Sequence, residues 1–400
     1  MEIKRNIFNK LEREIKEPEI SILLGARQVG KSTLLRQIEK VAQRRGLKTR
    51  YYDLELSSDL EQLSGKPKDV FEELISGAQV VFIDEFHYLE NASKIFKAVY
   101  DSRKKVKIFA SGSSSMEIHK HLKESLAGRF TKTIIYPLSF FECQQIPGFG
   151  FEDYCRWGGM PGLIHKHSVE EKMALLENIV STYLTKDIKA LIQEENVRAF
   201  NSLLYLIAQS QGSLLSIPSL ARETGLSEPT VARHLEIMSQ TYVCFGVTSF
   251  SQNLANELKK SRKHYLFDIG IRNGLLKDFR PPDIREDKGP IYEAFAFLHL
   301  LAQTKPNHEI RFWRTKKGEE VDFILLKDRI PIPIEVKSSS TETAIPKGIR
   351  SFLKRYPKAP FGVVLDAVPR QEARQQTTVE GRPVYFRPIT QTISLDDLAK

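Results

Sequence analysis

The sequence is poor in the features that mark secreted and membrane proteins. Its 400 residues include three cysteines, Cys143, Cys155 and Cys244, an odd number without a C-x-x-C pair. So few cysteines argue against a disulfide framework and fit a reducing compartment. No apolar run approaches the roughly 18 residues that cross a bilayer, and residues 1 to 16 are charged throughout, unlike a signal peptide. We therefore expect a cytoplasmic protein with no membrane partner.

The sequence also lacks internal repeats and low-complexity tracts, and its composition is that of an ordinary globular protein. Hydrophobic residues make up 41% of it and charged residues 28%. A chain of 400 residues exceeds the size at which one core keeps growing, so two or three domains are expected. The net charge of +10 suits a polyanionic partner, but charge alone does not identify a nucleic-acid-binding protein.

The first 145 residues alternate between two kinds of pattern. Short apolar runs of strand type lie at residues 19 to 25, 49 to 56, 78 to 85 and 105 to 112, with helical or polar stretches between them. This alternation is typical of α/β proteins and predicts a parallel sheet with helices on both faces over residues 1 to 145.

A glycine-rich loop follows the first of these strands. "GARQVGKS", residues 25 to 32, matches G-x-x-x-x-G-K-[ST] and precedes a helical pattern, which is the context of a phosphate-binding loop. Its glycines let successive N–H groups face phosphate oxygens, its lysine would reach the β and γ phosphates, and its serine would ligate Mg²⁺. The predicted ATP-binding residues are Gly25, Ala26, Arg27, Gln28, Val29, Gly30, Lys31, Ser32 and Thr33.

Two carboxylates end the strand "VVFIDE", where open α/β sheets place their ligands. We expect Asp84 to hold the Mg²⁺ of the nucleotide through water and Glu85 to act as the catalytic base. The alternative for an isolated Asp-Glu pair is a helix cap, which the nearby phosphate loop makes less attractive. The next strand ends in "ASGSSS", where Ser111 and Ser113 are candidates to sense the γ phosphate, although turn formation explains these serines equally well.

Residues 146 to 280 are expected to be mainly helical, with a winged helix-turn-helix at about 200 to 250. In such folds the second helix enters the major groove, so Thr230, Arg233 and His234 are the candidates for contact with double-stranded DNA. The same helix carries Glu228 and Glu236, which disfavour a strong duplex binder. Docking of a protein partner is an equally good alternative.

After a segment rich in proline and charge, residues 281 to 400 again read as α/β. Glu335 and Lys337 share one face of a strand, and Asp322 lies on a hairpin partner just upstream. Close carboxylates repel unless a cation lies between them, which suits Mg²⁺ or Mn²⁺ as a second metal. The alternative is a surface ion pair between Glu335 and Lys337 without a chemical role.

Taken together, these motifs resemble those of prokaryotic AAA+ ATPases whose P-loop domain is fused to a C-terminal DUF4143 domain. The matching stretches are "GARQVGKSTLL", "FIDEFHYL", "ASGSSS", "LAGRF", "YPLSFFE", "WGGMPG", "YLTKDI", "KHYLFDIG" and "WRTKKGEEVDFIL". The resemblance implies that Arg129 acts as an arginine finger on a neighbouring subunit of a homo-oligomer. The alternative is an ordinary surface arginine.

The C-terminal strands further resemble the PD-(D/E)XK nuclease superfamily. This resemblance implies Asp322 and Glu335 as metal ligands, Lys337 as the catalytic lysine and Glu293 as an acid contributed by the preceding helix. The leading hypothesis is thus an ATP- and Mg²⁺-dependent ATPase that acts on, or is regulated by, nucleic acid, with metal-dependent nuclease activity in the last domain left open. The alternative is a nucleotide-switched scaffold whose nuclease-like domain is not catalytic.

Overall fold

The computed structural model describes residues 3–102, 104–113, 126–182, 197–251, 262–338, 344–367 and 377–391. The chain forms two compact units. The N-terminal unit comprises Met1–Leu138, Met160–Ile164 and Ile237–Val243, and the C-terminal unit comprises Ser139–Gly159, His165–Glu236 and Cys244–Lys400. The "YLTKDI" motif at 183 to 188 lies outside the described residues. Within the described part of the chain, no helix is long and apolar enough to cross a membrane.

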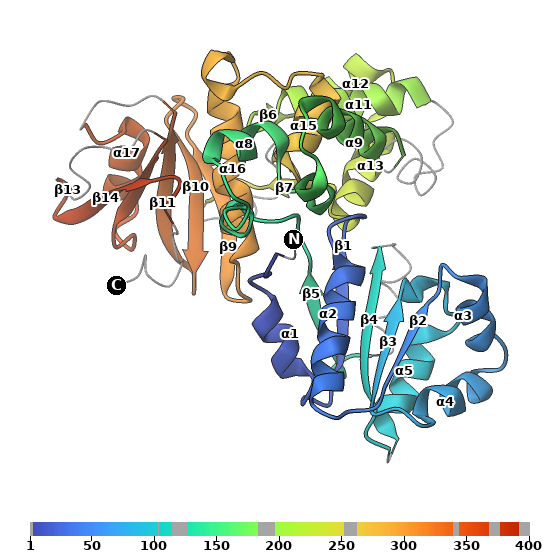
Figure 1. Cartoon of the computed structure of the whole chain (residues 1–400). Helices are drawn as coiled ribbons and strands as arrows, with labels where there is room; N and C mark the ends of the chain where they lie inside the picture. Colours follow the sequence, from blue (N-terminus) through green and yellow to red (C-terminus); the bar gives the residue numbers. More distant parts are fainter. Residues whose placement is uncertain are drawn as a thin grey trace. The chain divides into compact units, whose positions relative to one another are not determined.

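The N-terminal unit contains a five-stranded parallel sheet, as the alternating pattern predicts (Figure 1). Its strand order is β2-β3-β4-β1-β5. Every residue of β1 and β3 is buried, as expected when both faces of a parallel sheet are covered. The strands are β1 (Ile20–Gly25), β2 (Thr49–Asp53), β3 (Val80–Asp84), β4 (Lys107–Ser113) and β5 (Phe130–Ile134).

Helix α2 (Lys31–Arg44) connects the phosphate loop to this sheet. It buries Leu34, Leu35, Ile38 and Val41, whose spacing forms one apolar face, and it packs against β1, β3 and β4 (Figure 1). The other helices of the sheet region are α1 (Phe8–Glu14), α3 (Ser57–Gln62), α4 (Pro67–Ile75), α5 (Ala92–Asp101) and the short η1 (Phe86–Tyr88).

The middle of the chain is mainly helical. Two helices, α12 (Ile217–Thr224) and α13 (Glu228–Gln240), follow one another with Gly225 in the left-handed conformation between them. A small antiparallel sheet of order β6-β8-β7 accompanies them, built from β6 (Leu214–Leu215), β7 (Cys244–Val247) and β8 (Arg262–Leu266). The remaining elements are α7 (Phe140–Cys143), α8 (Phe151–Trp157), η2 (Pro161–His165), α9 (Val169–Ile179), α11 (Val197–Gln209) and α15 (Ile269–Leu276).

A buried carboxylate joins two of the motifs in this region. Asp268, the N-cap of α15, accepts backbone hydrogen bonds from Gly159 at 2.7 Å and Ile271 at 3.0 Å. A Cβ at Gly158 would lie 2.2 Å from the Asp268 carboxylate, and a Cβ at Gly270 would lie 1.9 Å from the Trp157 carbonyl oxygen. Gly158 of "WGGMPG" and Gly270 of "FDIG" are therefore required by the close packing of α8 on α15.

The C-terminal sheet has six strands in the order β13-β14-β12-β11-β10-β9. Its apolar core includes Trp313, Ile324, Phe352 and Val364. Figure 1 shows this sheet in orange and red, with α17 beside it. The elements are η4 (Pro282–Ile284), α16 (Lys288–Ala302), β9 (His308–Arg314), β10 (Glu320–Lys327), β11 (Ile330–Lys337), α17 (Lys347–Arg355), β12 (Gly362–Asp366), β13 (Thr377–Val379) and β14 (Arg382–Pro388). The mixed sheet confirms the predicted α/β class of this region.

Candidate nucleotide site and carboxylate cluster

The phosphate loop runs from the end of β1 to the start of α2. Gly25 allows the close approach of the segment after β5, because a Cβ there would lie 2.2 Å from the Ile135 carbonyl oxygen. Gly30 has a φ of 94°, a conformation that favours glycine, and directly precedes the first residue of the 14-residue helix α2. The loop thus leads into a helix N-terminus, where backbone N–H groups and the helix dipole favour an anion.

Lys31 is buried at the base of this loop, with 5% of its surface exposed. Its ammonium donates to the carbonyl oxygens of Gly25 at 3.2 Å and Ala26 at 2.9 Å. Burial lowers the pKa of Lys31, while the nearby carboxylates Glu85 and Asp84 act in the opposite direction. A desolvated ammonium with two carbonyl partners is well prepared to bind a phosphate oxygen.

The other loop residues take the positions that the motif predicts along the chain. Ser32 and Thr33 lie exposed on the first turn of α2, and Gln28 is exposed with a φ of 61°. Val29 and Ala26 are buried, and Arg27 is half-buried. These side chains leave the hydroxyl groups of Ser32 and Thr33 accessible to a ligand.

Asp84 ends β3 with 2% of its surface exposed, and hydroxyl groups on the two neighbouring strands fix its carboxylate. The Tyr51 hydroxyl on β2 donates to Oδ2 at 3.1 Å, and the Ser111 hydroxyl on β4 donates to Oδ1. Burial raises the pKa of Tyr51, so its phenol stays protonated and can donate. Ser111, a candidate for sensing phosphate, therefore contacts Asp84. Sequence reasoning missed Tyr51 because the order of strands in a sheet cannot be read from spacing.

Glu85 follows Asp84 in the left-handed conformation, with a φ of 51°. Its carboxylate is 14% exposed, and its Oε2 lies 3.1 Å from Nδ1 of His87. A glutamate in this conformation is uncommon, and the extended backbone of β3 ends there. The conformation turns Glu85 away from the ladder, while its backbone N–H donates to Oδ1 of Asp84 at 3.2 Å.

Arg5 is a second residue that sequence reasoning missed. The residue is 8% exposed, and its guanidinium donates to the carbonyl oxygens of Val29 at 3.0 Å and Tyr136 at 2.7 Å. It therefore ties the phosphate loop to the segment after β5. No sequence motif indicates the role of this arginine, because it lies 24 residues before its partner in the phosphate loop.

Two further candidates lie at opposite ends of the sheet. Ser113 ends β4, and its backbone pairs in register with Gly25; its side chain lies outside the description. Arg129 precedes β5 at the amino end of the sheet, where its carbonyl accepts from Ile20. Strand β1 has six residues, so about 20 Å separate that end from the phosphate loop. The Arg129 guanidinium pairs with Asp101 at 2.9 Å. The structure thus does not bring Arg129 to the loop of its own chain, and its role on a neighbouring subunit stays a prediction.

The three candidates on α13 differ in accessibility. Arg233 is exposed, and Thr230 is half-buried with its hydroxyl 2.7 Å from that of Ser227. His234 is 1% exposed, and its ring meets Phe200 edge-on at a centroid distance of 5.9 Å. This burial corrects the expectation for His234, because an imidazole packed inside the helical region is not available to contact DNA.

The C-terminal candidates come together around the β10–β11 hairpin. Lys327 pairs with Ile330 across a two-residue turn, and Phe323 pairs with Ile334, so Asp322 and Glu335 are the next residues along the two strands. The Lys337 ammonium donates to Oε1 of Glu335 at 2.7 Å. The shared face predicted for Glu335 and Lys337 is therefore present. Oδ2 of Asp322 accepts the backbone N–H of Val336 at 2.8 Å.

Glu293 on α16 lies beside two residues of β8 that sequence reasoning missed. Its Oε1 accepts from the Tyr265 hydroxyl at 2.5 Å and from the Lys263 ammonium at 3.0 Å. The same ammonium lies 2.7 Å from Oε1 of Glu320. Lys263 stands in the "KHYLFDIG" motif, but nothing in the spacing of that motif indicates contact with a strand almost 60 residues later.

This arrangement does not suit the second metal that the sequence suggested. Burial, followed by the charge of Asp322, raises the pKa of both Glu293 and Glu335 to about 7. Within the described ranges, no group of three or more His, Cys, Asp or Glu side chains is arranged to hold a metal ion. The metal site expected from Glu293, Asp322 and Glu335 thus finds no support here, because donors of the protein itself contact oxygens of all three.

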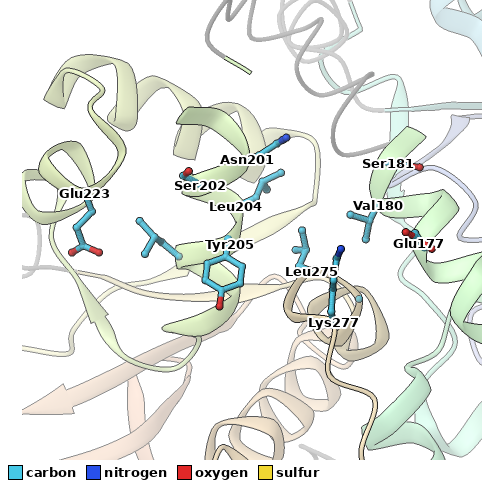
Figure 2. Close-up of a pocket in the computed structure, with 12 residues that line it drawn as sticks. Glu177, Val180, Ser181, Asn201, Ser202, Leu204, Tyr205, Glu223, Leu275 and Lys277 are labelled. Carbon is cyan, nitrogen blue, oxygen red and sulfur yellow. The ribbon is translucent and has the colours of Figure 1, made fainter. Parts of the chain in front are cut away.

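A separate cavity of about 760 Å³ lies in the helical region (Figure 2). Glu177, Val180 and Ser181 line one side, and Leu204 and Tyr205 of α11 line another, with Leu275 between them. Its charged lining residues are Glu177, Glu223 and Lys277. None of the candidate site residues named from the sequence is among these lining residues.

Three family models match consecutive parts of the chain. An AAA domain matches residues 17–144, a domain of unknown function (DUF8612) matches 149–281, and a domain of unknown function (DUF4143) matches 288–384. The predicted boundaries at 145/146 and 280/281 stay predictions.

Several proteins are similar over most of the chain. An uncharacterized protein of Mycobacterium tuberculosis is 26% identical over 88% of this chain and 77% of its own length. An uncharacterized protein of Methanocaldococcus jannaschii is 24% identical over 91% of this chain and 84% of its own. Among solved structures, a Walker-type ATPase of Pyrococcus abyssi has a TM-score of 0.51 and 18% identity, over 69% of this chain and 96% of that one. This likeness concerns the fold.

The parallel sheet and the loop before α2 define a P-loop NTPase fold of the AAA type. The chain thus combines a region that matches an AAA domain, residues 17–144, with a C-terminal region that matches a DUF4143 domain, residues 288–384.

Proposed function

We propose that this protein binds ATP with Mg²⁺ and hydrolyses it. The observation that carries the proposal is that a lysine and two carboxylates lie close together at the carboxyl ends of β1 and β3. The buried ammonium of Lys31 lies there within electrostatic reach of Asp84 and Glu85. The match to an AAA domain supports it.

The residues present fit a nucleotide and its metal. Lys31 would bind phosphate oxygens, and the exposed hydroxyl of Ser32 and the fixed carboxylate of Asp84 would hold Mg²⁺, directly or through water. Bound Mg²⁺ would neutralise charge on the phosphate oxygens. Glu85 would orient and deprotonate the attacking water, and Tyr51 would keep Asp84 in place.

The test compares Glu85→Gln with wild type in ATP binding and in phosphate release. We expect hydrolysis to fall at least about 100-fold while ATP affinity stays near that of wild type, because the amide cannot accept a proton. Glu90→Gln is the matched control, because Glu90 is exposed and lies five residues further on. Hydrolysis at the wild-type rate in Glu85→Gln would contradict the assignment of the base.

We further propose that nucleic acid regulates this hydrolysis through α12 and α13. The net charge of +10 and the exposure of Arg233 on α13 support the proposal. The expected result is faster ATP hydrolysis with double-stranded DNA, with a smaller effect in Arg233→Ala and at higher salt, because phosphate contacts release counterions. Arg198→Ala on α11 is the control. A rate that DNA leaves unchanged would favour the nucleotide-switched scaffold.

A further inference from the structure

The nuclease-like strands of the C-terminal unit imply a divalent cation between Asp322, Glu335 and Glu293. The positions of the protein's own cations argue against it. We infer that the ammonium of Lys263 is the resident cation of this carboxylate cluster, and that the cluster holds no divalent metal in the native protein. The inference concerns the C-terminal unit and goes beyond the ATPase function proposed above.

The first step is the rigidity with which Lys263 is held. Its side chain is 2% exposed, and β8 is the central strand of its sheet, paired with both β6 and β7. Its backbone lies opposite Leu214 on one side and Val247 on the other. The ammonium also lies 5.6 Å from the centre of the Phe312 ring. Lys263 is therefore part of a packed interior and not a mobile surface chain.

The second step is the charge that surrounds the ammonium. Burial alone would lower the pKa of Lys263, but the carboxylates Glu293, Asp322 and Glu320 raise it overall. The lysine thus stays protonated at neutral pH. Five carboxylates, those of Glu293, Glu320, Asp322, Glu335 and Asp366, surround two ammoniums, those of Lys263 and Lys337, and the Arg314 guanidinium lies 3.6 Å from Glu320. The protein itself supplies the two positive charges that one Mg²⁺ or Mn²⁺ would bring.

The third step is the availability of oxygen ligands. Magnesium needs several oxygens at about 2.0–2.1 Å in near-octahedral geometry. Oε1 of Glu293 already accepts from Lys263 and Tyr265, Oδ2 of Asp322 accepts from Val336, and Oε1 of Glu335 accepts from Lys337. Metal binding would have to break these bonds and bring a dication towards a buried ammonium.

One oxygen of the cluster differs from the others. Oε2 of Glu335 is buried, and no described donor hydrogen-bonds to it. If a metal bound to the native protein here, this oxygen would be its ligand. Glu335→Gln is therefore the variant that distinguishes a cluster that binds a divalent metal from a cluster whose cation is Lys263.

The experiment measures Mn²⁺ binding by the full chain without nucleotide, using calorimetry and the electron paramagnetic resonance signal of free Mn²⁺. We expect wild type and Glu335→Gln to bind Mn²⁺ identically, and neither to cut plasmid DNA. Lys263→Met should gain at least 10-fold in Mn²⁺ affinity, and Lys263→Met/Glu335→Gln should lose the gain. Lys347→Met, which alters an exposed lysine of α17, should behave as wild type.

Two results would overturn the inference. One is Mn²⁺ binding or DNA cleavage by wild type that Glu335→Gln abolishes, which would make the cluster a metal site despite Lys263. The other is a folded Lys263→Met variant with no gain in Mn²⁺ affinity, which would show that the ammonium does not stand in for a metal. Should Lys263→Met not fold, the comparison of wild type with Glu335→Gln still decides whether the native cluster binds a divalent cation.

Discussion

Two buried lysines of this protein have surroundings that shift their pKa values in opposite directions. Burial lowers the pKa of Lys31, whose hydrogen-bond partners are two carbonyl oxygens. Carboxylates raise the pKa of Lys263 in spite of its burial. An ammonium that only neutral oxygens contact gains most from an incoming anion, whereas one that two carboxylates contact is already compensated. The same residue type is thus suited to ligand binding in one unit and to structure in the other.

Asp268 leads to a prediction about pH at the scale of single residues. Burial raises its pKa from 3.8 to about 6, against the opposing effect of its backbone hydrogen bonds. The folded state therefore binds this proton more tightly than the unfolded chain. The resulting stability is fully present below about pH 4 and is lost as the pH rises through 6, amounting to about 3 kcal/mol over the window.

The measurement is urea unfolding of wild type and Asp268→Asn from pH 4 to pH 7, followed by tryptophan fluorescence. Both tryptophans of the sequence, Trp157 and Trp313, lie in the C-terminal unit, so the signal reports on that unit. The variant should be less stable at every pH, because an amide nitrogen would face backbone N–H groups. Its free energy of unfolding should also fall less with pH. Parallel profiles of the two proteins would show that Asp268 does not titrate in this window.

At the scale of elements, the sequence predicted individual strands and loops better than the contacts between them. The loop at 25 to 32 and the strand ending in Asp84 follow from local patterns, because each motif lies within one strand and its turn. Tyr51, Ser111 and Lys263 reach their partners across strands that are distant in sequence. Those contacts depend on strand order and on the packing of separate sheets, which periodicity does not encode.

The packing of α8 on α15 leads to a second prediction. Gly270 and Gly289 are each the second residue of a helix, in α15 and α16 respectively. A Cβ at Gly270 would lie 1.9 Å from the Trp157 carbonyl oxygen, whereas a Cβ at Gly289 would meet nothing within 4 Å. Gly270→Ala should therefore lower the thermal midpoint by several degrees or more, because backbone must move.

Gly289→Ala is the matched control for this change. Alanine reduces the freedom of the unfolded chain, so this variant should be unchanged or more stable by about 0.5 kcal/mol. Differential scanning calorimetry of both variants measures the contrast. Equal midpoints for Gly270→Ala and wild type would mean that α8 and α15 pack less closely than described.

At the scale of the whole molecule, most of the region predicted as a middle domain lies in one compact unit with the predicted last domain, the exceptions being Met160–Ile164 and Ile237–Val243. Backbone hydrogen bonds join the segment after β7 to β9, from Phe312 N–H to the Thr248 carbonyl at 3.1 Å and from Phe250 N–H to the Phe312 carbonyl at 2.5 Å. The Lys263 ammonium adds contacts from β8 to α16 and β10. The sequence suggested a boundary near 280 because proline and charge mark a loop there, and this boundary stays a prediction.

The ion cluster predicts how this unit responds to the loss of charge. Lys263→Met leaves Glu293 and Glu320 without their shared cation in a buried site, so it should lower the free energy of unfolding by about 3–5 kcal/mol. Lys263→Met/Glu293→Gln removes one charge of each sign and should recover at least about 1 kcal/mol of that loss. Urea unfolding followed by tryptophan fluorescence measures both. A double variant no more stable than Lys263→Met would mean that Glu293 and Lys263 are not coupled. Both variants should still unfold in one transition, because β8, α16 and β10 lie in one compact unit.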